Sequence, residues 1–323
     1  MSADKIATRD SYGRALVELG RQHDEIVVLD ADLAESTRTG MFQKEFPDRH
    51  IDCGIQEANM IGIAAGLAQS GKVPFCSSFA MFAAGRAYEQ IRTSVGYPHV
   101  NVKICATHAG ISVGEDGATH QCNEDIALMR TIPGMTIINP GDDVEARAAV
   151  HAAYELEGPV YLRLGRLAVP VMNDEANFRF EIGKGILLED GEDVTIIATG
   201  LMVAKAMEAA GVLSKEGIRA QVVSIHTIKP IDRELIIECA ARTGKVVTVE
   251  EHSIIGGLGS AVSEVICESP ELFKLGRPVL MRRLGIRDEF GVSGEGNALL
   301  AYYGLDPAGI ASTVRTVMEE AKA

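Results

Sequence analysis

Tryptophan is absent from this chain of 323 residues, and phenylalanine and tyrosine bring the aromatic share to only 5%. The six cysteines are scattered along the chain, and none belongs to a C-x-x-C pair. This pattern argues against a disulfide framework or a zinc site and favours buried, inert thiols. We expect no metal ligands within the chain.

Positive charge is also scarce, because 31 lysines and arginines face 45 aspartates and glutamates and leave a formal net charge of -14. A surface of that sign repels nucleic acid and anionic membranes, so neither is expected as a partner. No apolar run approaches the roughly 18 residues that span a bilayer. Residues 1–20 read as an amphipathic helix and not as a secretion signal. We therefore expect a cytoplasmic protein in which any anion site is built locally.

Short apolar runs alternate with helical patterns along the whole chain. This is typical of a parallel α/β sheet whose strands are buried on both faces. The length fits two domains better than one. This alternation of strand and helix patterns is interrupted once, at a segment that looks like a linker. The sequence predicts two consecutive α/β domains, each a mostly parallel sheet with helices on both faces: residues 1–170, a linker at 171–190, and residues 191–323.

Polar residues collect where the strands of the first predicted domain end. In such sheets ligands bind beyond the carboxyl ends of the strands, and several strand ends carrying polar groups together indicate a site. The candidates, in chain order, are Asp30, Asp32, Ser36, Gln56, Glu57, Phe79, Phe82, His108, Glu115, Asp116, His120, Arg163 and Arg166.

Structural roles compete with functional ones for several of these candidates. His108 and His120 flank a glycine-rich acidic loop, which favours function over a purely structural hydrogen bond. Phe79 and Phe82 fit a core as well as a ligand-stacking wall.

The same two alternatives, a structural role and a functional role, apply to two arginines on one predicted strand. Arg163 and Arg166 lie on opposite faces, so we expect one to form a structural ion pair and the other to be able to bind a phosphate. The glycine-rich "GGLGS" at 256–260 lacks a complete phosphate-loop pattern, and we interpret it as the turn that starts a helix.

The helix expected at 56–69 begins with Glu57 among apolar and small residues. A buried carboxylate needs a partner because its desolvation is costly, and we expect this partner not to be a protein side chain. On the same helix Ala58, Gly62 and Gly66 are four residues apart, so one face carries almost no side chain. Close approach of another helix would offset the cost of the glycines, either within the chain or across a subunit interface.

Three segments resemble transketolase, a thiamine-diphosphate enzyme: "DCGIQEANMIGIAAG" (52–66), "PFCSSFAMF" (74–82) and "THAGISVGEDGATHQ" (107–121). The similarity runs over essentially the whole chain and covers the pyrimidine-binding and C-terminal domains of that family. Deoxyxylulose-phosphate synthase fits less well, because it usually has alanine where Glu115 stands. The beta subunits of 2-oxo acid dehydrogenases have a different, alanine-rich loop before their histidine.

The resemblance implies specific roles for the strand-end residues. Glu57 is implied to hydrogen-bond N1′ of the pyrimidine ring of thiamine diphosphate and, with His120, to be catalytic. The other residues implied to contact the cofactor are Phe79, Phe82 and Asp32. Those implied to bind substrate are Arg9, Ser36, His108, Asp116, His120 and Arg166. The sequence departs from the family after Phe82, where "AAGRAYEQIR" has small residues in place of aromatics and a spacing to Arg86 that is one residue longer.

The family's G-D-G motif, which binds the cofactor's diphosphate and its metal together with a downstream asparagine, is missing. The resemblance therefore implies the C-terminal-half subunit of a split transketolase. A separate N-terminal-half subunit would hold most of the thiamine diphosphate and its Mg²⁺ (or Ca²⁺) in an α2β2 assembly.

The implied reaction transfers a two-carbon ketol unit from a ketose phosphate to an aldose, with sugar phosphates of the pentose phosphate type as substrates. Three alternatives stay open. They are a deoxyxylulose-phosphate synthase-like reaction, a transketolase for an unusual sugar, and a non-catalytic half that retains the fold.

Overall fold

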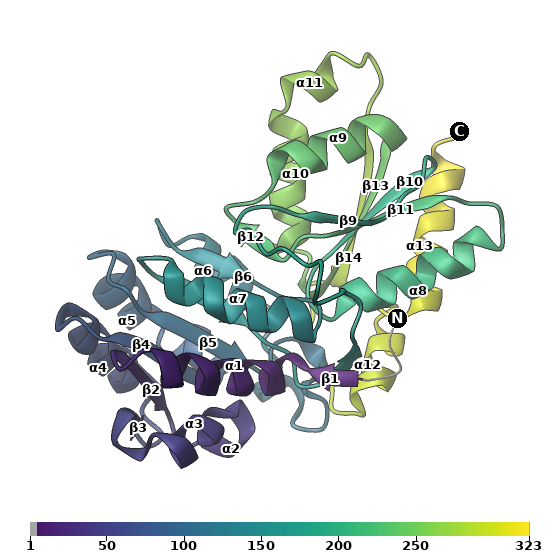
Figure 1. The fold of residues 1–323 in the computed structure, drawn as a ribbon. Helices are drawn as coiled ribbons and strands as arrows, with labels where there is room; N and C mark the ends of the chain where they lie inside the picture. Colours follow the sequence, from purple (N-terminus) through teal and green to yellow (C-terminus); the bar gives the residue numbers. More distant parts are fainter. Residues whose placement is uncertain (1–4, 323) are drawn as a thin grey trace.

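The computed structural model describes residues 5–322 and contains two α/β units, each built on its own sheet (Figure 1). The mostly parallel sheets with helices on both faces confirm the predicted fold class. Of the amphipathic helix expected at 1–20, residues 1–4 lie outside the described part. Residues Lys5–Ala7 form a short strand, β1, paired antiparallel with β8 (Ala168–Pro170), and helix α1 runs over Thr8–Gln22.

The first sheet has seven strands in the order β12-β6-β7-β5-β4-β2-β3. Their bounds are β2 (Ile26–Asp30), β3 (His50–Asp52), β4 (Val73–Phe79), β5 (Lys103–Thr107), β6 (Thr136–Ile138), β7 (Val160–Arg163) and β12 (Thr227–Lys229). Successive residues such as Val28 and Leu29 join different apolar clusters, because neighbouring side chains of a strand point to opposite faces. Both faces of this sheet are therefore buried.

Helices cover the two faces of the first sheet. One face packs on α1, α3 (Thr39–Glu45) and α7 (Asp143–Glu155), and the other on α4 (Glu57–Gln69) and α6 (Asp125–Arg130). Shorter helical turns are α2 (Ala34–Thr37), η1 (Pro47–Arg49), η4 (Ile111–Val113) and η5 (Gly117–Thr119).

The helix expected at about 82–94 differs from a regular α-helix. It consists of two π-helical segments, η2 (Met81–Arg86) and η3 (Ile91–Gly96), on either side of α5 (Tyr88–Gln90). A π-helical turn accommodates one residue more than an α-helical turn. This agrees with the longer spacing before Arg86 noted in the sequence.

The second sheet has five strands in the order β14-β13-β10-β11-β9. They are β9 (Ile186–Glu189), β10 (Val194–Ala198), β11 (Ala220–Ser224), β13 (Lys245–Ser253) and β14 (Leu280–Ile286). Its helices are α8 (Met202–Ser214), α9 (Arg233–Thr243), α10 (Leu258–Glu268), α11 (Pro270–Phe273), α12 (Gly296–Tyr302) and α13 (Pro307–Glu320). The expected linker at 171–190 is thus not wholly a connector, because β9 lies within it and pairs antiparallel with β11.

Strand β12 joins the two units. It follows β11 in the chain, yet it pairs antiparallel with β6 at the edge of the first sheet, with Thr227 opposite Ile138. The Lys229 ammonium donates to the backbone oxygens of Arg130 and Ile132, which fixes the strand further. Figure 1 shows β12 where the two units meet. Sheet membership therefore does not follow chain order at this point.

Arg163 makes a second connection between the units. Its Nε donates to Asp125 Oδ2 at 2.8 Å, and its Nη2 donates to the backbone oxygen of Glu251 in β13 at 2.9 Å. Both charged side chains of the ion pair are buried. Arg163, the last residue of β7, is therefore the structural one of the two arginines, as expected for one of the pair. The expectation that both lie on one strand is wrong, because Arg166 lies beyond the end of β7.

Four cysteines are buried free thiols, Cys53 is partly buried, and Cys267 is exposed, so the expectation of buried thiols is wrong for Cys267. No three His, Cys, Asp or Glu side chains within residues 5–322 are grouped to hold a metal ion. In the same part of the chain, no helix has the length and apolar character to cross a membrane.

Candidate active site

The carboxyl ends of β4 and β5 bring an aromatic cluster together. The two strands are parallel neighbours with Phe79 opposite Thr107, so Phe79 meets His108, the next residue along. Their rings stack with centroids 3.9 Å apart. Phe82 lies 6.1 Å from Phe79, and His120 packs edge-on against Phe82 at 5.2 Å. We call Phe79, Phe82, His108 and His120 the aromatic cluster.

Glu57 is the first residue of α4, and it is only 1% exposed. Its Oε2 accepts a hydrogen bond from Nη1 of Arg86 at 2.7 Å, and the Arg86 guanidinium carbon lies 4.6 Å from the centre of the Phe82 ring. The expectation that Glu57 has no protein partner is therefore wrong for this chain by itself. Arg86 reaches it because Phe82 and Arg86, four residues apart, share one side of the η2 turn.

His108 connects the aromatic cluster to basic side chains. It has a left-handed backbone with φ of 56°, which turns the chain sharply at the end of β5. Its Nε2 lies 3.1 Å from Nη1 of Arg9, and its Nδ1 lies 2.9 Å from Thr107 Oγ1. Burial, followed by the charges of Arg9 and Arg166, lowers the pKa of His108 to about 3. The ring is therefore neutral at physiological pH.

Three arginines surround this histidine, and we call Arg9, Arg38 and Arg166 the arginine cluster. Burial and the charge of Arg38 lower the pKa of Arg9, whose Nε is buried without a partner among residues 5–322. Arg9 Nη1 also donates to the backbone oxygen of Ser36 at 3.0 Å. An unpaired buried donor next to mutually repelling cations favours an anion at this position.

Arg166 is the more accessible member of this cluster. It donates to the backbone oxygen of Val113 and to Glu115 Oε2 at 3.1 Å, and its side chain is 38% exposed. Its charge contributes to the lowered pKa values of both Arg9 and His108, so it acts on the same region.

The remaining predicted residues are less tightly placed. Asp116 is exposed just before η5, and His120 Nδ1 lies 2.9 Å from Thr119 Oγ1. Asp32 is exposed with φ of 61°, and its backbone amide donates to Asp52 Oδ1 at 3.0 Å. Within residues 5–322 no hydrogen bond or ion pair joins the Asp32 side chain to the aromatic cluster.

Asp30, at the same strand end, has a structural role. Its Oδ2 accepts from Thr39 Oγ1 at 2.9 Å and lies 2.7 Å from Nε2 of His50. Both partners of the contact with His50 are buried. The Asp30 carboxylate therefore forms hydrogen bonds within the fold.

Sequence reasoning assigned no role to Arg86 or Arg38, which both lie at the site. For Arg86 the signal was the longer spacing after Phe82, which a π-helical turn explains. Arg38 ends α2 with a left-handed backbone and pairs with Asp10 at 2.5 Å, and no motif marks it.

The small-residue face of α4 is open. A Cβ added to Gly62 or Gly66 would meet no atom within 4 Å among the described residues, and both glycines are exposed. Packing within residues 5–322 therefore does not cover this face, and the alternative of a subunit interface stays a prediction.

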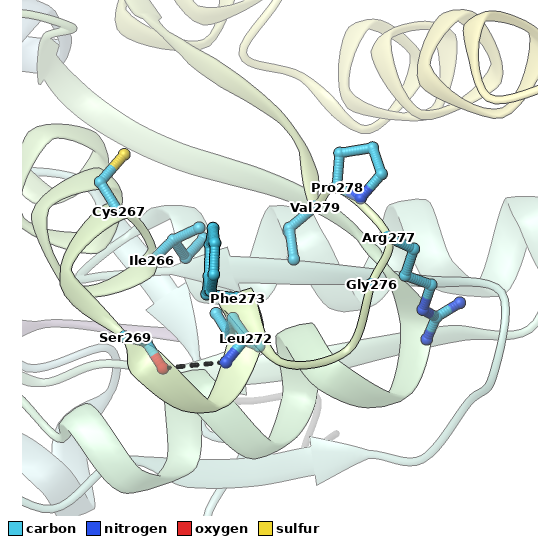
Figure 2. Close-up of a pocket in the computed structure, with 9 residues that line it drawn as sticks. All are labelled: Ile266, Cys267, Ser269, Leu272, Phe273, Gly276, Arg277, Pro278 and Val279. Atoms are coloured by element: carbon cyan, nitrogen blue, oxygen red, sulfur yellow. Dashed lines mark hydrogen bonds between the residues drawn. The ribbon is translucent and has the colours of Figure 1, made fainter.

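Two surface hollows differ in their relation to these residues. One, of about 520 Å³, lies beside the aromatic cluster and is lined by Met81, Thr119 and Phe290 among others. The other, of about 470 Å³, lies in the second unit next to Phe273 and Arg277 (Figure 2). None of the predicted site residues lines either hollow, but Met81 and Thr119 of the first are the chain neighbours of Phe82 and His120.

Comparisons with known proteins show which family this chain resembles. Models of the transketolase pyrimidine-binding domain and the transketolase C-terminal domain match residues 4–172 and 183–310. A protein of Methanocaldococcus jannaschii, inferred to be a transketolase C-terminal section, is 52% identical over 97% of this chain and 96% of its own length. A 6-deoxy-6-sulfo-D-fructose transketolase subunit of Clostridium sp. (strain MSTE9) is 44% identical over 96% and 94% of the two chains.

A solved structure extends the agreement to three dimensions. It is described as a split gene transketolase, an inactive beta4 tetramer. It matches this chain with a TM-score of 0.87 and 51% identity, over 98% of this chain and 99% of its own. The chain therefore belongs to the transketolase family.

Proposed function

We propose that this chain is the C-terminal-half subunit of a split, thiamine-diphosphate-dependent transketolase. The observation that carries the proposal is the placement of a buried carboxylate, Glu57, beside the aromatic cluster, with the arginine cluster around His108 at the same sheet edge. One region of the chain thus offers a hydrogen-bond acceptor, stacking rings and anion-binding cations.

The residues present fit the pyrimidine ring of the cofactor. A carboxylate accepts hydrogen bonds from any suitably placed N–H donor, so Glu57 can bond to a protonated ring nitrogen in place of Arg86. In this proposal Glu57 holds a proton at N1′ of the ring, while Phe79 and Phe82 stack on its face. Asp32 contributes from the neighbouring strand end. When bound, thiamine diphosphate supplies the electron sink that lets a carbon–carbon bond beside a carbonyl break and re-form.

The arginine cluster fits the phosphate of a sugar substrate. Arg9 and Arg166 supply charge, neutral His108 accepts a hydrogen bond from Arg9 and holds that guanidinium in place, and Ser36 lies next to Arg9. Asp116 and His120 are assigned to the sugar hydroxyls, with His120 also moving protons. We propose the transfer of a two-carbon ketol unit from a ketose phosphate to an aldose, in the cytoplasm.

The diphosphate and its Mg²⁺ (or Ca²⁺) are assigned mainly to a separate N-terminal-half subunit, because the G-D-G motif is missing from this chain. Two copies of each subunit would form an α2β2 assembly. The related structure described as an inactive beta4 tetramer supports the idea that such a chain lacks activity without this partner.

Reconstitution tests the proposal. The purified chain is expected to show no ketol transfer, and the pair with an N-terminal-half subunit is expected to convert xylulose 5-phosphate plus ribose 5-phosphate. Pyruvate plus glyceraldehyde 3-phosphate tests the deoxyxylulose-phosphate synthase-like alternative. Activity of the chain alone would contradict the split arrangement. A fully active pair carrying Glu57→Ala would favour a non-catalytic, structural half.

A transketolase for an unusual sugar is the second candidate. The Clostridium relative acts, by its name, on a sulfonated fructose. A sulfonate is an anion that the arginine cluster could bind in place of a phosphate. Assaying the same pair with 6-deoxy-6-sulfo-D-fructose against fructose 6-phosphate separates the two candidates.

A further inference from the structure

Arg86 lies between two surfaces that the proposed function reserves for the cofactor. Its guanidinium carbon is 4.6 Å from the centre of the Phe82 ring, and its Nη1 is 2.7 Å from Glu57 Oε2. A guanidinium is planar, cationic and rich in N–H donors. In these respects it matches an aminopyrimidine ring protonated at N1′.

The burial of the two partners is unequal. The Glu57 side chain is 1% exposed, whereas the Arg86 side chain is 50% exposed. A buried carboxylate without any partner is strongly disfavoured, so the chain without cofactor needs this contact. A half-exposed arginine keeps much of its hydration and can be released at little cost.

The local backbone sets up this contact. Within η2 the amide of Ala87 donates to the Phe82 oxygen at 3.3 Å, which is the i to i+5 bond of a π-helical turn. The turn presents Phe82 and Arg86 on the side of α4, where Glu57 begins that helix.

We propose that the Arg86 side chain occupies the pyrimidine position in the cofactor-free chain and leaves it when thiamine diphosphate binds. This inference rests on the proposed function. A permanent role, in which Arg86 stays on Glu57 and orients it for the ring, makes the opposite prediction for cofactor affinity.

The first experiment tests the contact in the chain alone by thermal unfolding. Arg86→Met keeps the apolar stem and removes the charge, and Arg92→Met, in the exposed part of η3, is the matched control. Arg86→Met is expected to lower the melting temperature in the wild-type background but not in a Glu57→Gln background. If Arg86→Met lowers the melting temperature equally in both backgrounds, the contact between Arg86 and Glu57 does not stabilise the chain, and the inference is overturned. If Arg86→Met does not fold, Arg86→Gln replaces it.

The second experiment titrates thiamine diphosphate at fixed Mg²⁺ into the reconstituted pair by calorimetry. Arg86→Met is expected to tighten binding about two- to fivefold, the range for losing a competing half-exposed ion pair, and Arg92→Met to leave it unchanged. Unchanged or weaker binding by Arg86→Met overturns the inference. Failure of the wild-type pair to bind the cofactor at all overturns the proposed function instead, and the inference with it.

Discussion

Nη1 of Arg9 lies 3.1 Å from Nε2 of His108, and this contact fixes the tautomer of the histidine. A guanidinium can only donate, so Nε2 accepts, and the proton of the neutral ring is on Nδ1. Nδ1 then donates to Thr107 Oγ1 at 2.9 Å. His108 is therefore a fixed hydrogen-bonding group, and the positive charge at this point of the site comes from the arginines.

His108→Gln is expected to weaken the binding of phosphorylated substrates. His108 acts on the phosphate through Arg9, so in the reconstituted enzyme the KM for a ketose phosphate should rise about tenfold, the effect of one lost hydrogen bond to a charged group, here the Arg9 guanidinium, while kcat changes little. Steady-state kinetics with the matching unphosphorylated ketose is the control, since its KM should not move. An equal rise for both sugars would show that His108 does not act through the phosphate.

The open face of α4 leads to a prediction about assembly. Gly66→Leu adds a side chain whose Cβ would have no atom of residues 5–322 within 4 Å, and it improves helix propensity, so the fold of the subunit should be kept. If the face packs against another subunit, light scattering should show a smaller assembly. Gly211→Leu in α8, also exposed and without neighbours, is the matched control. Unchanged assembly by Gly66→Leu would rule out this face as an interface.

The buried ion pair of Arg163 and Asp125 lies within the first unit and holds the arginine that donates to Glu251 of the second unit, so we expect it to contribute strongly to the stability of the protein. Asp125→Asn leaves the Arg163 charge buried, and urea unfolding should show a loss of about 3–5 kcal/mol. The exposed pair Arg282–Glu320 is the control, and Arg282→Met should cost at most about 1 kcal/mol. A similar loss for both variants would mean that burial does not decide the effect.

The ion pair of Arg163 and Asp125 also makes the stability of the protein depend on pH. Burial acts to raise the pKa of Asp125, but the charges of Arg163 and His252 and two hydrogen bonds hold it below its ordinary value. The stability from this pair is therefore present above the ordinary aspartate pKa and is lost as the pH falls into the acid range below it. Asp125→Asn should remove that part of the acid sensitivity.

Glu145 makes the stability depend on pH in the opposite direction. Burial raises its pKa to about 8, and its Oε2 accepts from the amide of Gly141 at 2.5 Å. A folded pKa above the unfolded value contributes stability that is full below about 4.5 and is lost as the pH rises through about 8.

Glu145→Gln imitates the protonated form and should raise the free energy of unfolding at pH 8 by on the order of 1–3 kcal/mol. At pH 4 the gain should vanish. Glu155→Gln, exposed at the other end of α7, is the control for a general charge effect and should change stability little at either pH. A gain that is equal at both pH values would contradict the prediction.

The sequence predicts the parallel sheets and much of the site, because local patterns determine both. The continuous apolar runs mark strands buried on two faces. Phe79 ends β4 and His108 directly follows β5, the parallel neighbour of β4, and this brings the two rings together. Asp232 accepts a hydrogen bond from the amide of Leu235 and caps α9, as its position before a helical pattern indicates.

Features that depend on distant contacts could not be predicted in this way. The pairing of β12 with β6 joins segments about ninety residues apart. A strand of only three residues, such as β12, has no sequence pattern that indicates which strand it pairs with. Arg86 reaches Glu57 only because the backbone between Met81 and Arg86 adopts a π-helical turn. The tautomer of His108 depends on Arg9, which is far away in the chain.

The strand that crosses between the units constrains how the protein can be made or divided. A cut within 171–190 would not release two finished domains, because the first fragment would lack β12 and expose the row of unpaired amides and carbonyls along β6. During synthesis the first sheet cannot be completed until Lys229 has left the ribosome. The first unit therefore completes its fold only after part of the second unit has been synthesised.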